Sequence, residues 1–353
     1  IETMHAAIYS LDANGNVARE ELKEEEFYNE KAMDKVGVIR FTYPNLKPGN
    51  IVEYSYTMSE KNRLVVDNWV VQSQIPCAYA ETSVTIPEYS ALKDYTFGLD
   101  SVLKKKEKIT KGLDRDKFTY YKKEVRSFQP EPLMTSVTDN LLRVGFVLIP
   151  DNKIFMDDFS AQTIWRFTAN NFLKSSMYNE MVTKVIPGTE AIIDTARNFQ
   201  DKEQRFRYLY SVLKKRIPNK SGRSVSDDLG EAWKKKTATS TEINFLLHNL
   251  LSRAEIKNYL VFVSTREHGK VNREFPSIGQ FNQLDVMVDI NGTKFLTDAS
   301  LKYQSYNTPP IDVLNREALI LNPDQIAWAM ITDDRPLLKK HTDIFGKITA
   351  SGV

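Results

Sequence analysis

The sequence of 353 residues predicts a multidomain protein, in which an N-terminal antiparallel β domain precedes an α+β domain. In its first half, short runs of alternating polar and apolar residues are separated by turn dipeptides, which is typical of antiparallel strands. Near Asp157 the apolar spacing changes to the 3.6-residue period of helices. A last observation is the dipeptide Asn291-Gly292, which separates two further strand-like runs and indicates a hairpin after the helices.

The stretch from Ile1 to about Ile149 has the pattern of a β-sandwich or an open barrel. The dipeptides Asn14-Gly15 and Pro48-Gly49 predict turns. Apolar and polar residues alternate from Val52 to Met58, so we expect a half-buried strand there. The remaining strand-like runs are Gly37 to Tyr43, Val65 to Gln72, Thr82 to Ile86, and Phe118 to Val125. We expect this β domain to span residues 1–156.

Residues 157–306 are expected to form the second domain, which begins with helices. Helical spacing of large apolar residues runs from Trp165 to Leu173, from Ile192 to Phe199 and from Glu203 to Lys215. The stretch from Pro218 to Lys236 is rich in Lys, Ser and Gly and is expected to be a loop. Residues 307–353, with several prolines, are either a tail over this domain or the start of a further β domain.

The segment from Thr237 to Ala254 predicts a capped amphipathic helix. Thr239 and Glu242 have the spacing of a capping box, which places Ser240 in the first helical turn. Unpaired amides at that position stabilise negative charge and lower the pKa of a thiol, but this chain has a serine there. His248 lies off the expected apolar face, and we predict no chemical role for it.

The predicted hairpin fixes a register for the strands on either side of Asn291-Gly292. A two-residue turn places Ile290 opposite Thr293, and counting back places Asp285 opposite Asp298. Gln283, Asp285 and Asp298 then share one face. The other face, which should pack on the capped helix, carries Leu284, Val286, Val288, Ile290 and Phe295.

Two readings of the facing carboxylates stay open. Asp285 and Asp298 could share a proton, which would raise one pKa as in an acid/base pair. Alternatively, Asp285 forms an ion pair with a nearby Lys or Arg, or a longer turn changes the register.

Composition and motifs exclude several classes of function. A net charge of +2, from 48 basic and 46 acidic residues, argues against nucleic-acid binding. Cys77 is the single cysteine, and the sequence has no HExxH motif or paired histidines, so we predict no metal site and no cofactor. No run of about 18 apolar residues occurs, so no membrane-spanning helix is expected.

The N-terminal half resembles a known family. The segments FTYPNLKPGNIVEYSYT, WVVQSQIP and VTIPE, which lie between Phe41 and Glu88, are similar to a β-sandwich domain of undetermined function. That domain precedes a transglutaminase-like domain in many bacterial envelope proteins. The resemblance therefore implies a transglutaminase-like neighbour downstream and a location in the periplasm or cell envelope.

The stretch from Lys202 to Ser300 resembles the transglutaminase core, which has a papain-like fold and uses Cys, His and Asp. The resemblance places the Gly-Asp-Cys motif of that family on Ala238, Thr239 and Ser240, its histidine on Gln283 in QFNQLDV, and its aspartate on Asp298 in FLTDAS. The catalytic Cys and His are thus replaced by Ser240 and Gln283.

These replacements remove the expected chemistry. A serine hydroxyl is far harder to ionise than a thiol and needs a general base, whereas Gln283 can only form hydrogen bonds. We therefore favour a non-catalytic binding or structural module, with a peptide or protein ligand in the cleft. The alternative is a hydrolase or acyltransferase on peptide or amide bonds, which uses Ser240 with an unconventional base. His268 in STREHG is the candidate for that base, although a loop histidine beside glycine is usually only solvated.

Overall fold

The computed structural model describes residues 1–33, 36–59, 66–149, 160–220, 222–223, 228–322, 325–333, 341–343 and 345–346. The chain forms two compact units, residues 1–64 and residues 65–353. The boundary expected near Asp157 lies among residues 150–159, outside the described part of the chain. Residues 66–149 belong to the same compact unit as the helices that follow them.

The strands described in the first unit are all antiparallel, and a short 3-10 helix at Glu24–Glu26 lies between them. A three-stranded sheet has the order β2-β1-β5, and β3 pairs with β4. The bounds are β1 Thr3–Leu11, β2 Val17–Glu21, β3 Phe27–Met33, β4 Val36–Phe41 and β5 Ile51–Thr57. The strand expected from Val52 to Met58 is present as β5, but it is exposed along its whole length instead of half-buried. Alternation alone specifies two faces, whereas burial also requires a second layer over one of them.

The second unit begins with two three-stranded antiparallel sheets, β7-β10-β9 and β6-β11-β8. Their bounds are β6 Trp69–Val70, β7 Cys77–Pro87, β8 Ala91–Phe97, β9 Leu103–Ile109, β10 Arg115–Val125 and β11 Arg143–Ile149. Both sheets contribute to one core, which contains Ile86, Phe118, Tyr120, Val144 and Phe146. The two sheets therefore form two layers over shared apolar side chains.

Six helices follow in the described residues, namely α1 Ala161–Lys174, α2 Ser176–Thr183, α3 Glu190–Arg197, α4 Lys202–Arg216, α5 Leu229–Lys235 and α6 Ser240–Arg253. The three runs of helical spacing between Trp165 and Lys215 correspond to α1, α3 and α4. Helix α2 was not expected from the sequence. The expectation of a loop from Pro218 to Lys236 was wrong in part, because α5 lies within this stretch. Trp233 of α5 is buried.

A five-stranded antiparallel sheet of order β14-β13-β12-β15-β16 completes the unit. Its strands are β12 Asn258–Val263, β13 Gln283–Ile290, β14 Thr293–Thr297, β15 Glu317–Leu321 and β16 Ala327–Met330. The hairpin register is confirmed, since Ile290 pairs with Thr293 and both turn residues have positive φ, 54° for Asn291 and 90° for Gly292. The strands β15 and β16 continue this sheet, because β15 pairs with β12 and β16 pairs with β15.

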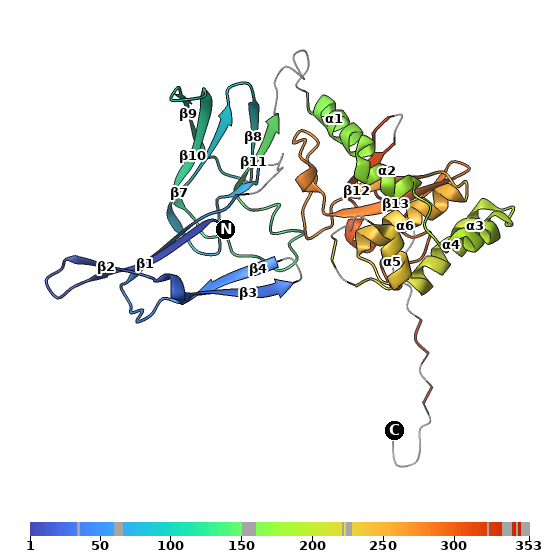
Figure 1. The fold of residues 1–353 in the computed structure, drawn as a ribbon, viewed down its shortest axis with the longest axis horizontal. Helices are drawn as coiled ribbons and strands as arrows, with labels where there is room; N and C mark the ends of the chain where they lie inside the picture. Colours follow the sequence, from blue (N-terminus) through green and yellow to red (C-terminus); the bar gives the residue numbers. More distant parts are fainter. Residues whose placement is uncertain are drawn as a thin grey trace. The chain divides into compact units, whose positions relative to one another are not determined.

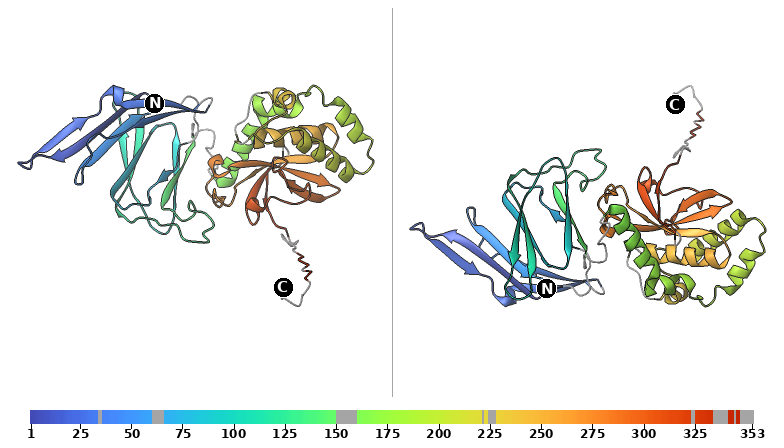
Figure 2. Two further views of the ribbon diagram at one scale, coloured as in Figure 1. Left: turned by 90° about the horizontal axis from the view of Figure 1, so that it is seen from below. Right: turned by 90° about the horizontal axis from the view of Figure 1, so that it is seen from above.

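The helices lie on one face of this sheet, with α6 directly against β12 and β13 (Figures 1 and 2). The predicted helix-facing residues of the hairpin, from Leu284 to Phe295, belong to the core that includes α6. However, α6 does not have one buried face and one exposed face. All residues from Glu242 to Leu251 are buried, because α2, α4 and α5 also contact this helix. His248 is therefore buried, with 4% exposure, and the expectation that it lies off the core was wrong.

Phe275 joins the sheet β6-β11-β8 to the loop that precedes β13. Its side chain is fully buried and lies against Tyr95 and Phe97, with ring centroids 5.0 and 5.3 Å away. A Cβ atom on Gly145 of β11 would lie 2.5 Å from the Phe275 ring, so the strand can approach this ring only with glycine at that position. This contact fixes one end of the 264–280 loop.

Candidate functional site

Ser240 lies where the sequence places it, in the first turn of α6. The capping box is formed: the Thr239 hydroxyl accepts from the Glu242 amide at 3.3 Å, and the Glu242 carboxylate accepts from the Thr239 amide at 2.8 Å. Ser240 donates its amide and its hydroxyl to the same acceptor, the Gly222 carbonyl, both at 3.2 Å. Among the hydrogen bonds of the described residues, none joins this hydroxyl to a histidine.

Asp298 is held by α6 through Asn244, which lies one turn after Ser240. Asn244 donates its Nδ2 to Asp298 Oδ1 and to the Leu284 carbonyl, both at 2.8 Å, and its Oδ1 accepts from the Ala299 amide at 3.0 Å. Asp298 Oδ1 also accepts from the Ser300 amide at 2.8 Å. The Asp298 carboxylate, which the sequence resemblance matches to a catalytic aspartate, thus joins α6 to the chain after β14.

Gln283 contacts Asp285 and not Asp298. Its Nε2 donates to Asp285 Oδ1 at 2.9 Å, as expected for side chains two residues apart on one face of a strand. The β13–β14 ladder ends at Val286 and Thr297, so Asp298 lies one residue past the last pair. A basic side chain at position 283 would therefore meet Asp285 first.

Asp285 is completely buried, and its Oδ2 has no hydrogen-bond partner among the described residues. Burial raises the pKa of Asp285 well above its ordinary value, and the negative charge of Asp298 raises it further. The Gln283 hydrogen bond and the positive charge of Arg223 act in the opposite direction. Burial also raises the pKa of Asp298, against the hydrogen bonds from Ser300 and Asn244. The two carboxyl groups thus interact, and both burial and the charge of Asp298 act to raise the pKa of Asp285.

The histidines of this unit within the described residues do not replace the missing base. His268 is half-exposed, and its Nε2 lies 3.1 Å from the Gly279 carbonyl. His248 forms a hydrogen bond between its Nδ1 and Asn258, and burial lowers its pKa to about 4. His248 lies two turns after Ser240 on a helix that is buried all round, so it is a packed core residue.

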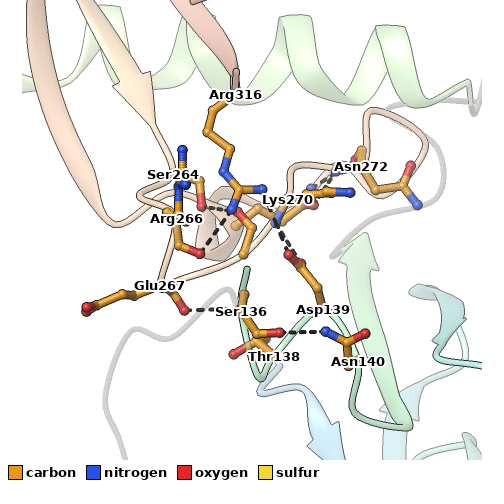
Figure 3. A network of polar contacts seen from close by, with 12 residues as sticks. Ser136, Thr138, Asp139, Asn140, Ser264, Arg266, Glu267, Lys270, Asn272 and Arg316 are labelled. Atoms are coloured by element: carbon orange, nitrogen blue, oxygen red, sulfur yellow. Dashed lines mark hydrogen bonds and ion pairs between the residues drawn. The ribbon is translucent and has the colours of Figure 1, made fainter. Parts of the chain in front are cut away.

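The loop that carries His268 is fixed by polar contacts with residues 136–140, which Figure 3 shows. Asp139 Oδ1 accepts from the Lys270 amide at 2.7 Å, and Ser136 Oγ donates to the Glu267 carbonyl at 3.2 Å. Gly269 has φ 128°, and a Cβ there would lie 2.8 Å from Asp139 Oδ1. The glycine of STREHG, Gly269, therefore allows the two loops to approach each other closely. The contacts between these loops fix the backbone on either side of His268.

No group of side chains suited to a metal ion occurs within the described residues. The helices of the described chain are too short or too polar to cross a membrane.

Comparisons with known proteins bear on the fold. A solved structure of a putative protease from Parabacteroides distasonis ATCC 8503 is similar at a TM-score of 0.62 and 12% identity, covering 90% of this chain and 60% of that one. A putative cysteine protease from Cytophaga hutchinsonii matches at 9% identity over 77% of this chain and 92% of that one, but its TM-score of 0.29 carries no argument. No protein-family model and no curated protein matches the chain. The first likeness concerns the fold alone, and it shows that most of this chain has the fold of part of that protein.

Asn244 is the residue of this site that the sequence analysis missed. A signal existed, because Asn244 is a polar residue four positions after Ser240 and lies between Ile243 and Phe245 in a largely apolar helix. A fully buried asparagine in such a helix needs specific partners, and these turn out to be on both sides of the hairpin.

Proposed function

We propose that this chain is a non-catalytic relative of the transglutaminase-like proteins, serving as a binding or structural module in the periplasm or cell envelope. The fold supports this proposal only at the level of a protease-like architecture. The non-catalytic role is inferred from the chemistry of the matched positions, Ser240, Gln283 and Asp298, and the location from the sequence resemblance.

The observation that carries the proposal is how Asp298 is bonded. In a Cys-His-Asp site the carboxylate orients and stabilises the imidazole. Here Asp298 Oδ1 already accepts from Asn244 and from the Ser300 amide, and the Ser240 hydroxyl donates to a carbonyl. A hydroxyl without a base and a carboxylate engaged by an amide supply neither nucleophile activation nor proton transfer.

The alternative is a hydrolase or acyltransferase that acts through Ser240 with an unconventional base. Asp285 is the titratable group that is hydrogen-bonded to Gln283, and its side chain is fully buried. A base must reach the proton it removes, so this burial argues against Asp285 in that role.

An assay for turnover tests the proposal. Purified protein and a Ser240→Ala variant are incubated at neutral pH with peptide, amide and amine-acceptor substrates, and the products are measured by mass spectrometry. We expect no turnover above the rate without protein for either chain. Turnover that the Ser240→Ala substitution abolishes would establish the alternative.

A further inference from the structure

A groove lies beside the segment that follows Asp298, and Ala299 and Ser300 are among its lining residues. It has a volume of about 1000 Å³ and lies between one side of α4 and the segment from Ala299 to Tyr306. Four of its lining residues are basic, Arg207, Lys214, Lys215 and Lys302, and none of its described lining residues is Asp or Glu. The whole chain has a net charge of only +2, so this concentration of positive charge is local.

Lys214 is the central cation of this groove. Its side chain is half-buried, and its Nζ donates to the Gln304 carbonyl at 2.6 Å and lies 5.0 Å from the centre of the Tyr210 ring. No carboxylate among the described residues lies within ion-pair distance of Lys214. Burial lowers the pKa of Lys214, and the more distant charge of Asp298 raises it. An incompletely compensated ammonium group in a groove attracts an anion.

The other cations define the length of the site. Arg207, Lys214 and Lys215 are seven and eight residues apart, so they lie along one side of α4 over about 12 Å. That distance corresponds to about four residues of an extended peptide. Tyr306 adds an aromatic surface at the Arg207 end, where the guanidinium carbon lies 5.4 Å from the ring centre. The position of the Tyr210 ring is fixed by its hydroxyl, which donates to the Gln304 carbonyl at 3.0 Å.

We propose that this groove binds an acidic peptide segment in extended form, with one carboxylate on Lys214 and further carboxylates on Arg207 and Lys302. A peptide fits better than a nucleic acid, because the row of cations is only about 12 Å long and the net charge of the chain is only +2. The inference rests on the proposed binding role, but it places the ligand beside the matched catalytic positions and not on them.

The test is a binding measurement by fluorescence anisotropy with a labelled six-residue peptide rich in Glu. The same peptide with Gln in place of Glu is the uncharged control, and a single-stranded oligodeoxynucleotide of equal charge is the second anion. We expect the full chain to bind the Glu peptide, with an affinity that falls as salt is added, and to bind the Gln peptide at least about tenfold more weakly.

Variants locate the site. Lys214→Met keeps most of the apolar stem and should weaken Glu-peptide binding by about tenfold or more, and Lys214→Arg should restore much of it. Lys202→Met is the matched control, because Lys202 is an exposed lysine of the same helix outside the groove, and it should leave the affinity within about twofold. Thermal melts of each variant check that the fold is intact.

Equal affinity for the Glu and Gln peptides, equal effects of Lys214→Met and Lys202→Met, or stronger binding of the oligonucleotide than of the peptide would overturn the assignment. Whether the peptide is intact or cleaved after incubation distinguishes a failure of this inference from a failure of the proposed function. Failure to bind leaves the non-catalytic role intact, whereas a peptide that binds and is cleaved confirms the groove and contradicts that role.

Discussion

Replacement of Asn244 by alanine tests whether α6 and the Asp298 segment depend on one buried amide. The substitution removes three hydrogen bonds, to the Leu284 carbonyl, to Asp298 Oδ1 and from the Ala299 amide, at a position with no exposed surface. A buried hydrogen bond contributes about 1 kcal/mol net, and a buried group left without a partner costs about 1–3 kcal/mol. Asp298 keeps the Ser300 amide, so the expected loss is about 3–4 kcal/mol.

The assay is urea unfolding at neutral pH, and a double-mutant cycle gives the coupling to Asp298. Asn249→Ala is the matched control, because Asn249 is equally buried on the same helix and donates to the carbonyls of Met181, Val182 and Lys184. We expect both single variants to destabilise, but only Asn244→Ala to couple with Asp298→Ala, by about 1 kcal/mol or more. A loss below about 0.5 kcal/mol for Asn244→Ala, or equal coupling for both asparagines, would refute the reasoning.

Three further predictions concern the cap, the buried histidine and the matched catalytic positions. Thr239→Ala should destabilise by about 1 kcal/mol, as loss of an N-cap does, and Ser240→Ala by less; the reverse order in thermal melts would contradict the observed cap. His248 is held neutral, since its folded pKa of about 4 lies below the ordinary 6.5, so its contribution is present above pH 6.5 and is lost as pH falls toward 4. In urea unfolding, this decrease in the free energy of unfolding at acid pH should reach about 3 kcal/mol. The decrease should be absent in His248→Phe and unchanged in the surface control His268→Gln. In the double variant Ser240→Cys, Gln283→His the thiol pKa, measured by iodoacetamide reactivity in a Cys77→Ala background, should be lower than in Ser240→Cys alone; equal values would show that the two positions do not converge.

Local patterns account for most of what the sequence predicted correctly. The capping box at Thr239 and the type of turn at Asn291-Gly292 depend on residues close in the chain, so their geometry follows from the sequence and is observed. The helical period likewise located α1, α3, α4 and α6.

The errors concern features that depend on packing between distant segments. His248 and β5 were misjudged because periodicity shows which residues share a face and not what covers that face. The hydrogen bond from Asn244 to Asp298 was not predicted, because it joins α6 to a segment more than 50 residues later and no local pattern indicates such a pair.

The central claim, that Ser240 is not a nucleophile, is tested most directly by labelling with a fluorophosphonate, because this reagent reports an activated serine without knowledge of the substrate. The full chain is incubated with the probe at pH 7 to 8, and intact mass and peptide mapping identify any adduct. We predict no adduct at Ser240, and a spectrum that matches the Ser240→Ala variant. A stoichiometric adduct at Ser240 that is absent from this variant would contradict the account.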